Sequence, residues 1–357
     1  NTSLKFSPKI NIIYGDNAQG KTNLLESIYV LGLTKSHRSF IDNNLIRSGV
    51  KKALIKGNIE NNDINTKLEI VIENKNKLLK IDDDEIRKIS DYISRMNIII
   101  FYPEDLELIK GSPAIRRRYI NLELSQINPR YLLTLNEYNR LLKIRNECLK
   151  KMQKNIYVDE NYFNVITDYI IDKAILISLF RKKFIDELNE ISGDIYKKIA
   201  NIDNFYIKYK PLISIENDDI NKLKEILKRK FNDVLPNEIK FGSTLLGPHR
   251  DDFEFYIDSQ NIKNYGSQGQ QRLAVLSVKL SEIEIFKKNT KTEPILLLDD
   301  VFSELDDKKK NSLLQYINNK TQTIITTTDL KNINQEIINE ALTIKIENGN
   351  IYSEEEV

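Results

Sequence analysis

Three patterns of hydrophobic and polar residues follow one another along the chain. Up to about residue 112, short apolar runs alternate with polar turns, which predicts strands. Apolar residues then recur at helical spacing, and after about residue 235 the short strand-like runs return. We therefore expect an α/β domain formed by 1–112 and 236–357, interrupted by an inserted, all-helical arm at 113–235.

The first segment predicts two kinds of strand. Ile10–Tyr14 and Asn97–Phe101 are continuous apolar runs, typical of strands buried on both faces, and Leu4–Phe6 reads as a further short strand. Three β-branched or alternating runs predict a small antiparallel β lobe. These runs are Ala53–Ile59, Asn65–Glu73 and Leu78–Ile81, with a hairpin turn at Asn74–Asn76.

The arm and the last segment predict helices and short strands, respectively. In the arm, Ala114–Asn155 is helical apart from a break near Pro129, and Asn161–Asn201 and Lys222–Phe231 follow the same spacing. In the last segment, helices are expected within Tyr265–Lys287 and Asp307–Asn318. The expected strands there are Lys240–Leu245, Phe253–Ile257, Pro294–Leu298 and Thr321–Thr326.

A glycine-rich segment, Gly15–Thr22, lies between the strand at Ile10–Tyr14 and a helical pattern at Asn23–Leu31. Its sequence, GDNAQGKT, fits G-x-x-x-x-G-K-[ST] in the strand–loop–helix context that a phosphate-binding loop needs. The backbone N–H groups of such a loop face one anion. The alternative is a glycine turn before an ordinary helix.

The loop residues have distinct expected roles. Lys21 is expected to reach the outer phosphates of a nucleotide and to act in catalysis, and the Thr22 hydroxyl is expected to hold Mg²⁺. The expected nucleotide ligands are Gly15, Asp16, Asn17, Ala18, Gln19, Gly20, Lys21 and Thr22.

A second acidic element follows near the C-terminal end of the chain. The apolar run Ile295–Leu298 ends in Asp299 and Asp300. In phosphate-loop NTPases an Asp at such a strand end helps to hold Mg²⁺, so we expect Asp299 to be the metal ligand and Asp300 the catalytic base. The alternative is a strand followed by an aspartate helix cap.

Two further motifs narrow the class. Tyr265–Arg272, YGSQGQQR, precedes a helix, and its Ser267, Gly269 and Gln270 are expected to form a second anion site; a plain glycine turn is the alternative. With Asp299 and the SELD segment Ser303–Asp306, this order resembles the signature, acidic strand and D-loop of ABC-type ATPases. That resemblance implies a composite ATP site closed by a second copy of the chain.

The chain departs from the usual ABC pattern at two positions. Thr328 stands where a switch histidine is usual, and Asp300 replaces the usual glutamate base with a shorter side chain. Both departures favour slow hydrolysis and a switch rather than a pump. Transporter subunits also place the signature much closer to the phosphate loop, whereas most of this chain separates Gly20 from Ser267.

The combined motifs resemble the RecF family of bacterial recombination and repair ATPases, within the SMC and RecF group. The resemblance is carried by GDNAQGKTNLLESIY, FYPEDLELIKGSPAIRRRYIN, YLLTLNEYNRLLKIRN, LLGPHRDD, YGSQGQQR and LLLDDVFSELD, which span nearly the whole chain. The family's usual preceding strand is missing before Asn1, which we expect to reflect upstream trimming. Arg38 resembles an arginine near the γ-phosphate in SMC-type heads, although a surface arginine is the alternative.

The resemblance implies a function. It implies an ATP-dependent DNA-binding protein of recombinational repair that dimerises on ATP, hydrolyses it slowly and binds duplex near single-strand gaps. It also implies work with RecR and RecO in loading RecA. A structural SMC-like chromosome ATPase head is the alternative, but it needs a long heptad arm or a zinc-hook Cys pair, and neither is visible.

The composition limits the possible classes of protein but does not identify a function. The 54 Lys and Arg nearly balance the 52 Asp and Glu, for a formal net charge of +2, so only local charge can identify a partner. Cys148 is alone, which excludes an internal disulfide framework and favours a reducing compartment. No apolar run approaches the ~20 residues of a membrane helix, and no signal peptide is visible, so we expect a cytoplasmic protein without a membrane partner.

Basic residues of the arm are the candidates for DNA contact. Phosphate contacts would give salt-dependent affinity that is independent of sequence. The alternatives are a solvated lysine-rich face and, for Arg116–Arg118, internal salt bridges. The candidates are Lys110, Arg116, Arg117, Arg118, Lys143, Arg145, Lys150, Lys151, Lys154, Arg181, Lys182 and Lys183.

Overall fold

The computed structural model describes residues 2–39, 41–61, 64–73, 76–93, 95–213, 219–318, 320–331 and 333–353. Its contacts divide the chain into two compact units. The first comprises Asn1–Leu106, Asp194–Ile202 and Arg272–Val357, and the second comprises Glu107–Gly193 and Asp203–Gln271. Residues 236–271, which the sequence assigns to the ATPase domain, therefore belong by their contacts to the second unit.

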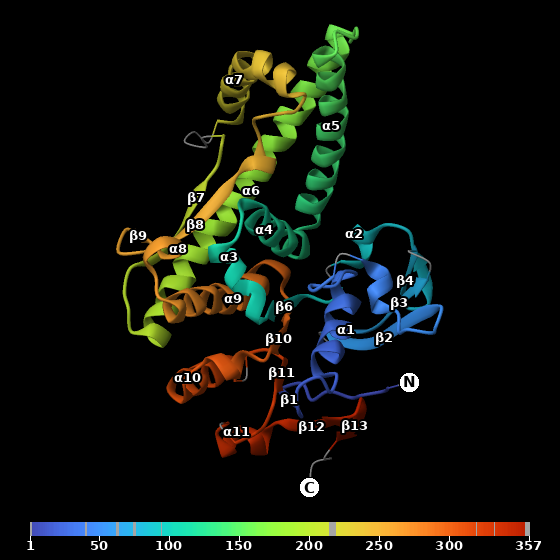
Figure 1. Ribbon diagram of the computed structural model, residues 1–357, viewed down its shortest axis with the longest axis vertical. Coiled ribbons are helices and arrows are strands. Elements are labelled where there is room, and N and C mark those ends of the chain that lie inside the picture. The colour runs from blue at the N-terminus through green and yellow to red at the C-terminus, as the bar shows by residue number, and fades with distance from the viewer. Residues whose placement is uncertain are drawn as a thin grey trace. The chain divides into compact units, whose positions relative to one another are not determined.

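A six-stranded sheet forms the centre of the first unit, with strand order β13-β12-β1-β11-β10-β6 (Figure 1). All neighbouring strands are parallel except β13, which pairs antiparallel with β12. Four of these strands were expected, whereas β12 and β13 were not. The strands are β1 (Ile10–Tyr14), β6 (Ile98–Phe101), β10 (Ile295–Asp299), β11 (Thr323–Thr327), β12 (Leu342–Glu347) and β13 (Asn350–Ser353).

A four-stranded antiparallel sheet, in the order β2-β3-β4-β5, completes the β structure of the first unit. It confirms the predicted β lobe, and its strands are β2 (Lys52–Asn61), β3 (Ile64–Glu73), β4 (Asn76–Ile81) and β5 (Asp84–Ile86). Most of the hairpin turn expected at Asn74–Asn76 lies outside the described residues. Leu4–Phe6 is not a strand, which corrects that expectation: β1 already has β11 and β12 on its two sides.

The helices of the first unit are mostly short. The exception is α9 (Gln268–Thr290), which starts in the second unit and is buried on more than one face, as shown by Val275, Leu276 and Val278. A helix that is apolar on several sides belongs inside a core. The others are α1 (Lys21–Leu33), α2 (Ile89–Tyr92), α10 (Asp307–Ile317) and α11 (Gln335–Glu340), with 3-10 turns at Asp42–Leu45, Pro103–Leu106 and Val301–Glu304.

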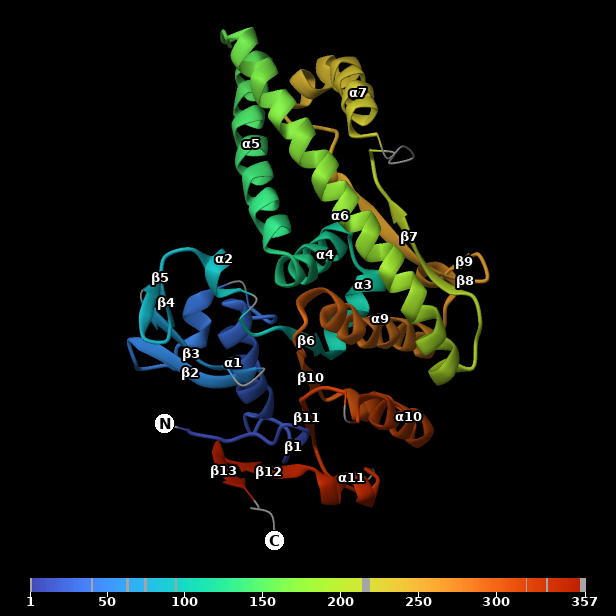
Figure 2. The same cartoon turned by 180° about the vertical axis from the view of Figure 1, so that it is seen from behind.

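Long helices dominate the second unit, and Figure 2 shows α5, α6 and α7 running together. Cys148, Leu149 and Phe163 form one of its apolar clusters, against which Leu235 and Ile239 pack. Its helices are α3 (Glu107–Lys110), α4 (Pro113–Ile127), α5 (Pro129–Gln153), most of α6 (Glu160–Ala200), α7 (Ile220–Phe241) and α8 (Ile262–Tyr265), with a 3-10 turn at Pro248–Arg250.

The arm is not entirely helical, which corrects the sequence prediction. Phe205–Lys210 forms β7, which pairs antiparallel with β8 (Asp252–Ile257), and β8 pairs in turn with β9 (Gln260–Asn261). The alternation of FYIKYK buries Phe205 and Ile207 on one face. The strand expected at Lys240–Leu245 is wrong, because α7 continues through Pro236 to Phe241.

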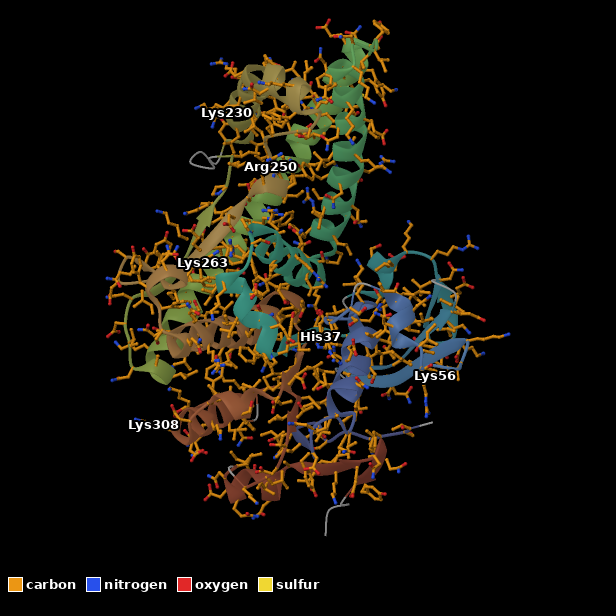
Figure 3. The ribbon with its side chains drawn as sticks, in the orientation of Figure 1. His37, Lys56, Lys230, Arg250, Lys263 and Lys308 are labelled. Carbon is orange, nitrogen blue, oxygen red and sulfur yellow. The ribbon has the colours of Figure 1, made fainter. Side chains whose placement is uncertain are left out.

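A partly buried histidine, His249, joins the approach to β8 to α5. The Nε2 of His249 must donate to the Thr244 carbonyl oxygen, 3.1 Å away, so its Nδ1 accepts from the Tyr138 hydroxyl at 2.6 Å. Arg250, labelled in Figure 3, donates its Nε to the same carbonyl at 3.3 Å. These contacts make a structural turn of the motif LLGPHRDD.

The stability of the protein is expected to fall as the pH drops below about 6.5. Burial lowers the pKa of His249 below its ordinary 6.5, so the unfolded chain takes up the proton first and acid favours unfolding. The contribution of neutral His249 to the free energy of unfolding is complete above pH 6.5. It is lost as the pH falls toward the lower pKa that His249 has in the folded protein. Urea unfolding between pH 5.5 and 7.5 measures this slope, and His249→Gln should flatten it. An equally steep slope in that variant would contradict the assignment.

No helix among the described segments is both long enough and apolar enough to cross a membrane.

Candidate nucleotide-binding site

The site lies where parallel strands end. The carboxyl ends of β1, β11 and β10 meet at one edge of the sheet, where Tyr14 is paired with Thr327 and Asp299 with Thr326. Ligands bind at this edge in open α/β sheets. Strand pairing therefore brings the loop after β1 beside the two carboxylates after β10, although the two segments are distant in the sequence.

Two glycines permit the path of the phosphate-binding loop. Gly15 has φ +151°, and a Cβ atom there would overlap the Ile346 carbonyl oxygen. Gly20 has φ +105° and forms the N-cap of α1. Backbone positions with such angles favour glycine, which gives a physical reason for both glycines of the motif.

Lys21 folds back along the loop. Its Nζ donates to the carbonyl oxygens of Gly15 at 2.6 Å and Asp16 at 2.8 Å, and the residue is only 8% exposed. Burial lowers the pKa of Lys21, while the carboxylates of Asp300, Asp16 and Asp299 oppose that shift. The ammonium lies near the carboxylates of Asp299 and Asp300, which follow the end of β10. A bound phosphate would further stabilise the charged form of Lys21, which burial disfavours.

The loop residues border two cavities. The first has a volume of about 270 Å³ and is lined by Asn17, Ala18, Gly20, Lys21, Thr22, Asn23, Arg38, Asp299, Asp300 and Thr326. Gly15, Asp16 and Gln19 instead border a second cavity of about 640 Å³, together with the ends of β11 and β12. The Gln19 side chain also accepts the Asn348 N–H at 2.5 Å, which ties the loop to the β12–β13 turn.

A hydrogen-bond chain links the proposed metal ligands. The Thr22 hydroxyl donates to Asp299 Oδ1 at 3.1 Å, and the Thr326 hydroxyl donates to the same oxygen at 2.7 Å. Two neighbouring oxygen ligands of an octahedral Mg²⁺, each at about 2.1 Å, lie about 3 Å apart. The spacing between Thr22 and Asp299 and their hard oxygen atoms therefore fit this ion.

Thr326 also supports Asp300. The backbone N–H of Asp300 donates to Thr326 Oγ1 at 3.0 Å, and Asp300 has a left-handed φ of +50°, an uncommon conformation for a residue other than glycine. Thr326 was not among the residues predicted for the site; within the triplet Thr326–Thr328 only Thr328 was singled out, and it borders the larger cavity. The parallel pairing of β10 with β11 is the signal that identifies it.

Thr326→Val is expected to lower single-turnover ATP hydrolysis by about tenfold or more, because partners of metal ligands typically contribute 10–100-fold. Valine keeps the shape but removes the hydroxyl that orients both aspartates. ATP affinity, measured by equilibrium binding, should change much less than the rate. Thr326→Ser is the matched control and should restore most of the rate; a serine variant as slow as valine would argue against this positioning role.

Arg38 borders the smaller cavity but is only partly constrained. Its side chain is 50% exposed and lies 3.6 Å from Glu26 Oε2 and 3.3 Å from Asn23 Oδ1. The position suits contact with a bound anion, and the exposure equally suits the surface arginine that the sequence allowed.

The signature residues belong to the second unit. Ser267 N donates to Gln270 Oε1 at 2.8 Å, and Gln270 N donates to Ser267 Oγ at 3.2 Å. This reciprocal arrangement is a capping box at the start of α9. Gly269 has no crowding atom near its missing side chain, so the helix start is open to a ligand or partner.

Three arginines that the sequence offered for DNA contact are internal. Arg116 makes a bidentate pair with Asp252 at 2.6 and 2.9 Å, which corrects the DNA-contact expectation in favour of its salt-bridge alternative. Arg181 pairs with Asp251 at 3.0 Å, and Arg145 is also buried. Arg117 donates to the Asp251 carbonyl at 2.9 Å.

The lysine candidates differ from the arginines, because they stay at the surface. Lys182 and Lys183 form weak pairs within their own helix, with Asp186 at 3.6 Å and Glu187 at 3.9 Å. The second unit also carries lysines that the sequence analysis did not consider, such as Lys230 on α7 and Lys263 on α8 (Figure 3). Among the described residues, the exposed candidates that form no ion pair are Lys110, Lys143, Lys150, Lys151 and Lys154.

Comparison with known proteins covers nearly the whole chain. The family model described as RecF/RecN/SMC N terminal domain matches residues 1–352. The DNA replication and repair protein RecF of Bacillus mycoides (strain KBAB4) is 45% identical over 350 residues, which cover 98% of this chain and 93% of that protein. Its counterpart in Bacillus cereus (strain ZK / E33L) is also 45% identical, with the same coverage.

Two solved structures are also similar to this chain. The recombination mediator protein RecF with ATP, of the RecFOR pathway, has a TM-score of 0.90 at 31% identity, over 99% of this chain and 93% of that one. The Smc head domain of Pyrococcus furiosus, with an extended coiled coil and bound to a ScpA domain, has a TM-score of 0.53 at 16% identity, over 98% and 91%. The second similarity concerns the fold alone, and together they confirm the predicted ABC-type head.

Proposed function

This chain belongs to the RecF family of DNA replication and repair proteins, and from that premise we propose that it is an ATP-dependent DNA-binding protein of recombinational repair. In this proposal ATP closes two copies of the chain into a clamp on DNA with single-strand gaps, and slow, DNA-stimulated hydrolysis reopens it. The observation that carries the proposal is the convergence of Lys21, Thr22, Asp299 and Asp300 on one cavity.

The chain's own residues supply most of the proposed chemistry. The loop N–H groups and the N-terminus of α1 bind the phosphates, and Lys21 leaves its carbonyl partners to contact the outer ones. Asp300 orients and deprotonates the attacking water, while Thr326 holds its backbone. Thr22 and Asp299 would hold Mg²⁺, which when bound neutralises charge on the transferred phosphoryl group.

Dimerisation on ATP is the second part of the proposal. The signature residues Ser267, Gly269 and Gln270 lie in the other unit of the chain, at an exposed helix start. A helix N-terminus favours an anion, so we assign these residues to the nucleotide held by a second copy. Arg38 would add positive charge at the same cavity.

The partners are part of the proposal. A solved RecF structure is that of a recombination mediator in the RecFOR pathway, which supports RecR and RecO as partners of this chain. We further propose DNA and, through RecR and RecO, RecA as partners, and a cytoplasmic location. The SMC-like chromosome head is the second candidate, supported by the fold similarity. The short arm disfavours it, because α5 has 25 residues and α6 has 41.

A subunit-mixing experiment tests the composite site. Lys21→Ala removes the phosphate contact and Ser267→Arg blocks the signature, so each variant alone should lack ATPase activity. Only mixed dimers contain an intact site, one of their two, so the mixture regains activity, up to about half of that of a dimer with two intact sites. Gel filtration with and without ATP and gapped DNA should show the same dependence for assembly.

The mixture also separates the alternatives. If each chain completed its own site, the mixture would stay inactive, and the composite-site proposal would fail. Lys52→Ala, which changes an exposed lysine on β2, is the matched control for the loss of a lysine. Its activity should equal that of the unmodified protein.

A further inference from the structure

Ser36 holds together the turn that follows α1. Its hydroxyl accepts hydrogen bonds from the backbone N–H groups of Arg38 and Ser39, each at 2.9 Å, and donates to Glu26 Oε1. Ser36 is only 2% exposed, so little water competes for these bonds. A single side chain therefore ties the backbone on which Arg38 stands to the helix that follows the phosphate loop.

The beginning of this turn is also anchored. Thr34 has a left-handed φ of +60°, and its N–H donates to the Val30 carbonyl oxygen at 2.8 Å, which ends α1. Lys77 of β4 donates its Nζ to the Thr34 carbonyl oxygen and pairs with Asp42 Oδ1 at 2.6 Å. These contacts fix the point at which the chain leaves α1.

His37, labelled in Figure 3, packs the turn against two tyrosines. Its ring centre lies 5.0 Å from that of Tyr29 on α1, at 76°, and 4.9 Å from that of Tyr102 after β6, at 57°. Edge-to-face and tilted arrangements at such distances are favourable for aromatic rings. Ser36 and His37 therefore attach the turn to α1 through two consecutive side chains.

The guanidinium of Arg38 lies along α1 beside the nucleotide cavity. Its Nη1 is 3.6 Å from Glu26 Oε2 and donates to Asn23 Oδ1 at 3.3 Å. Asn23 and Glu26 are three residues apart on the helix and share one face, and Asn23 and Arg38 both line the cavity of about 270 Å³. The turn thus brings a cation to the cavity that Lys21 and the two aspartates also line.

The backbone of Arg38 is held more firmly than its charged group. The side chain is 50% exposed, and its pair with Glu26 is long; exposed pairs of this kind contribute little free energy. A phosphate in the cavity would form shorter, charge-assisted hydrogen bonds with the guanidinium. Exchange of Glu26 for a phosphate therefore costs little, and the fixed backbone reduces the entropy lost on binding.

We propose that Ser36 and Glu26 are positioning residues for ATP hydrolysis, which hold the turn from which Arg38 contacts an outer phosphate of ATP. The proposal rests on the proposed ATPase function and adds two residues to it. Because Lys21 and Asp299 line the same cavity, the phosphates that meet Arg38 there are the outer ones. Positive charge at that point stabilises the transferred phosphoryl group in the transition state, so the effect appears mainly in the rate and less in ATP affinity.

Single-turnover ATP hydrolysis by the full chain on gapped DNA tests the proposal. Ser36→Ala should lower the rate by about tenfold, because a misplacement of about 1 Å can cost up to about a hundredfold. ATP affinity, measured by equilibrium binding, should stay within about threefold. Ser39→Ala is the matched control, since that hydroxyl contacts Ile41 and Asn44 instead of Glu26, and it should leave the rate unchanged.

A double-mutant cycle separates positioning from a general loss of structure. If Ser36 acts through Arg38, Ser36→Ala should cost about tenfold in the unmodified background but less than about twofold in the Arg38→Ala background. Equal losses in the two backgrounds would show a merely structural role and overturn the proposal. An unchanged rate in Arg38→Ala would overturn it as well.

Two variants of Glu26 test which property of this side chain is needed. Glu26→Gln keeps an acceptor for the Ser36 hydroxyl, so its rate should stay within about threefold of the unmodified protein. Glu26→Leu removes the acceptor and should resemble Ser36→Ala. If Glu26→Gln were as slow as Glu26→Leu, the charge rather than the hydrogen bond would be responsible, and the assignment of Glu26 would be wrong.

Limited proteolysis examines the turn without ATP hydrolysis. Trypsin cuts after lysine and arginine, and Lys35 and Arg38 of the turn are exposed. Ser36→Ala should speed this cleavage, because loss of its hydrogen bonds favours local opening, whereas Ser39→Ala should not; equal cleavage of both variants would contradict the proposal. Failure of the proposed function would look different, because the unmodified protein would then not hydrolyse ATP and Lys21→Ala would change nothing.

Discussion

Lys21→Ala is expected to weaken ATP binding by about tenfold to a hundredfold, since hydrogen bonds to charged groups contribute about 1.5–3 kcal/mol. ATP-driven dimerisation should disappear at nucleotide concentrations that saturate the unmodified protein. The physical reason is the position of Lys21, which is 8% exposed and whose ammonium donates to the carbonyl oxygens of Gly15 and Asp16, partners that carry no full negative charge. Isothermal titration and sedimentation velocity measure the two effects.

The fold should not suffer from this change. Removing Lys21 removes a buried charge whose pKa is already lowered by burial, so the free energy of unfolding should stay equal or rise slightly. Lys21→Arg keeps the charge but not the compact ammonium, and it should also fail to dimerise. ATP affinity within twofold of the unmodified protein in both variants would refute the phosphate-binding role.

Glu238→Ala is expected to destabilise the protein by about 3–5 kcal/mol, as typically found when one partner of a buried ion pair is removed. Arg145 is 1% exposed and Glu238 0%, and their side chains are 2.7 Å apart. The remaining guanidinium would keep bonds to Thr244 and Thr167 and lie over the rings of Phe163 and Phe231. Those contacts cannot compensate the full charge. Urea unfolding followed by circular dichroism measures the loss.

Two comparisons show whether charge is the cause. The double variant Arg145→Met/Glu238→Leu removes both charges and should recover much of the lost stability, because paired burial itself is costly. Lys228→Ala breaks a pair with Asp168 in which both side chains are over 40% exposed, and its effect should be about 1 kcal/mol or less. If the double variant were as unstable as Glu238→Ala, the lost packing rather than the unpaired charge would be responsible.

Local sequence was sufficient for several parts of this protein. The motif at Gly15–Thr22 was recognisable locally, because its glycines, Lys21 and Thr22 stand at fixed positions between a strand and a helix. The apolar run that ends in Asp299 likewise marks a buried strand with carboxylates at its end. The helices α4, α5 and α6 follow from periodicity, and Pro129 marks the break between α4 and α5.

Other features could not be predicted from the sequence, because the residues that determine them are distant along the chain. FYIKYK alternates like a strand, but only the pairing of β7 with β8 makes it one. The sequence left DNA contact and an internal salt bridge open for Arg116, because its partner, Asp252, is distant in the sequence. Thr326 was not predicted as a site residue, because it reaches Asp299 and Asp300 only through the pairing of β11 with β10.

The sequence by itself identified the family and predicted the nucleotide site and the long helices of the arm, since these depend on residue types at short, regular spacings. The tertiary structure alone decided which charges are buried, which threonine orients the two aspartates and which unit the residues before α9 join. The physical reason is that burial and pairing are set by contacts between distant segments. The free energy of a charge therefore depends on neighbours that local sequence does not specify.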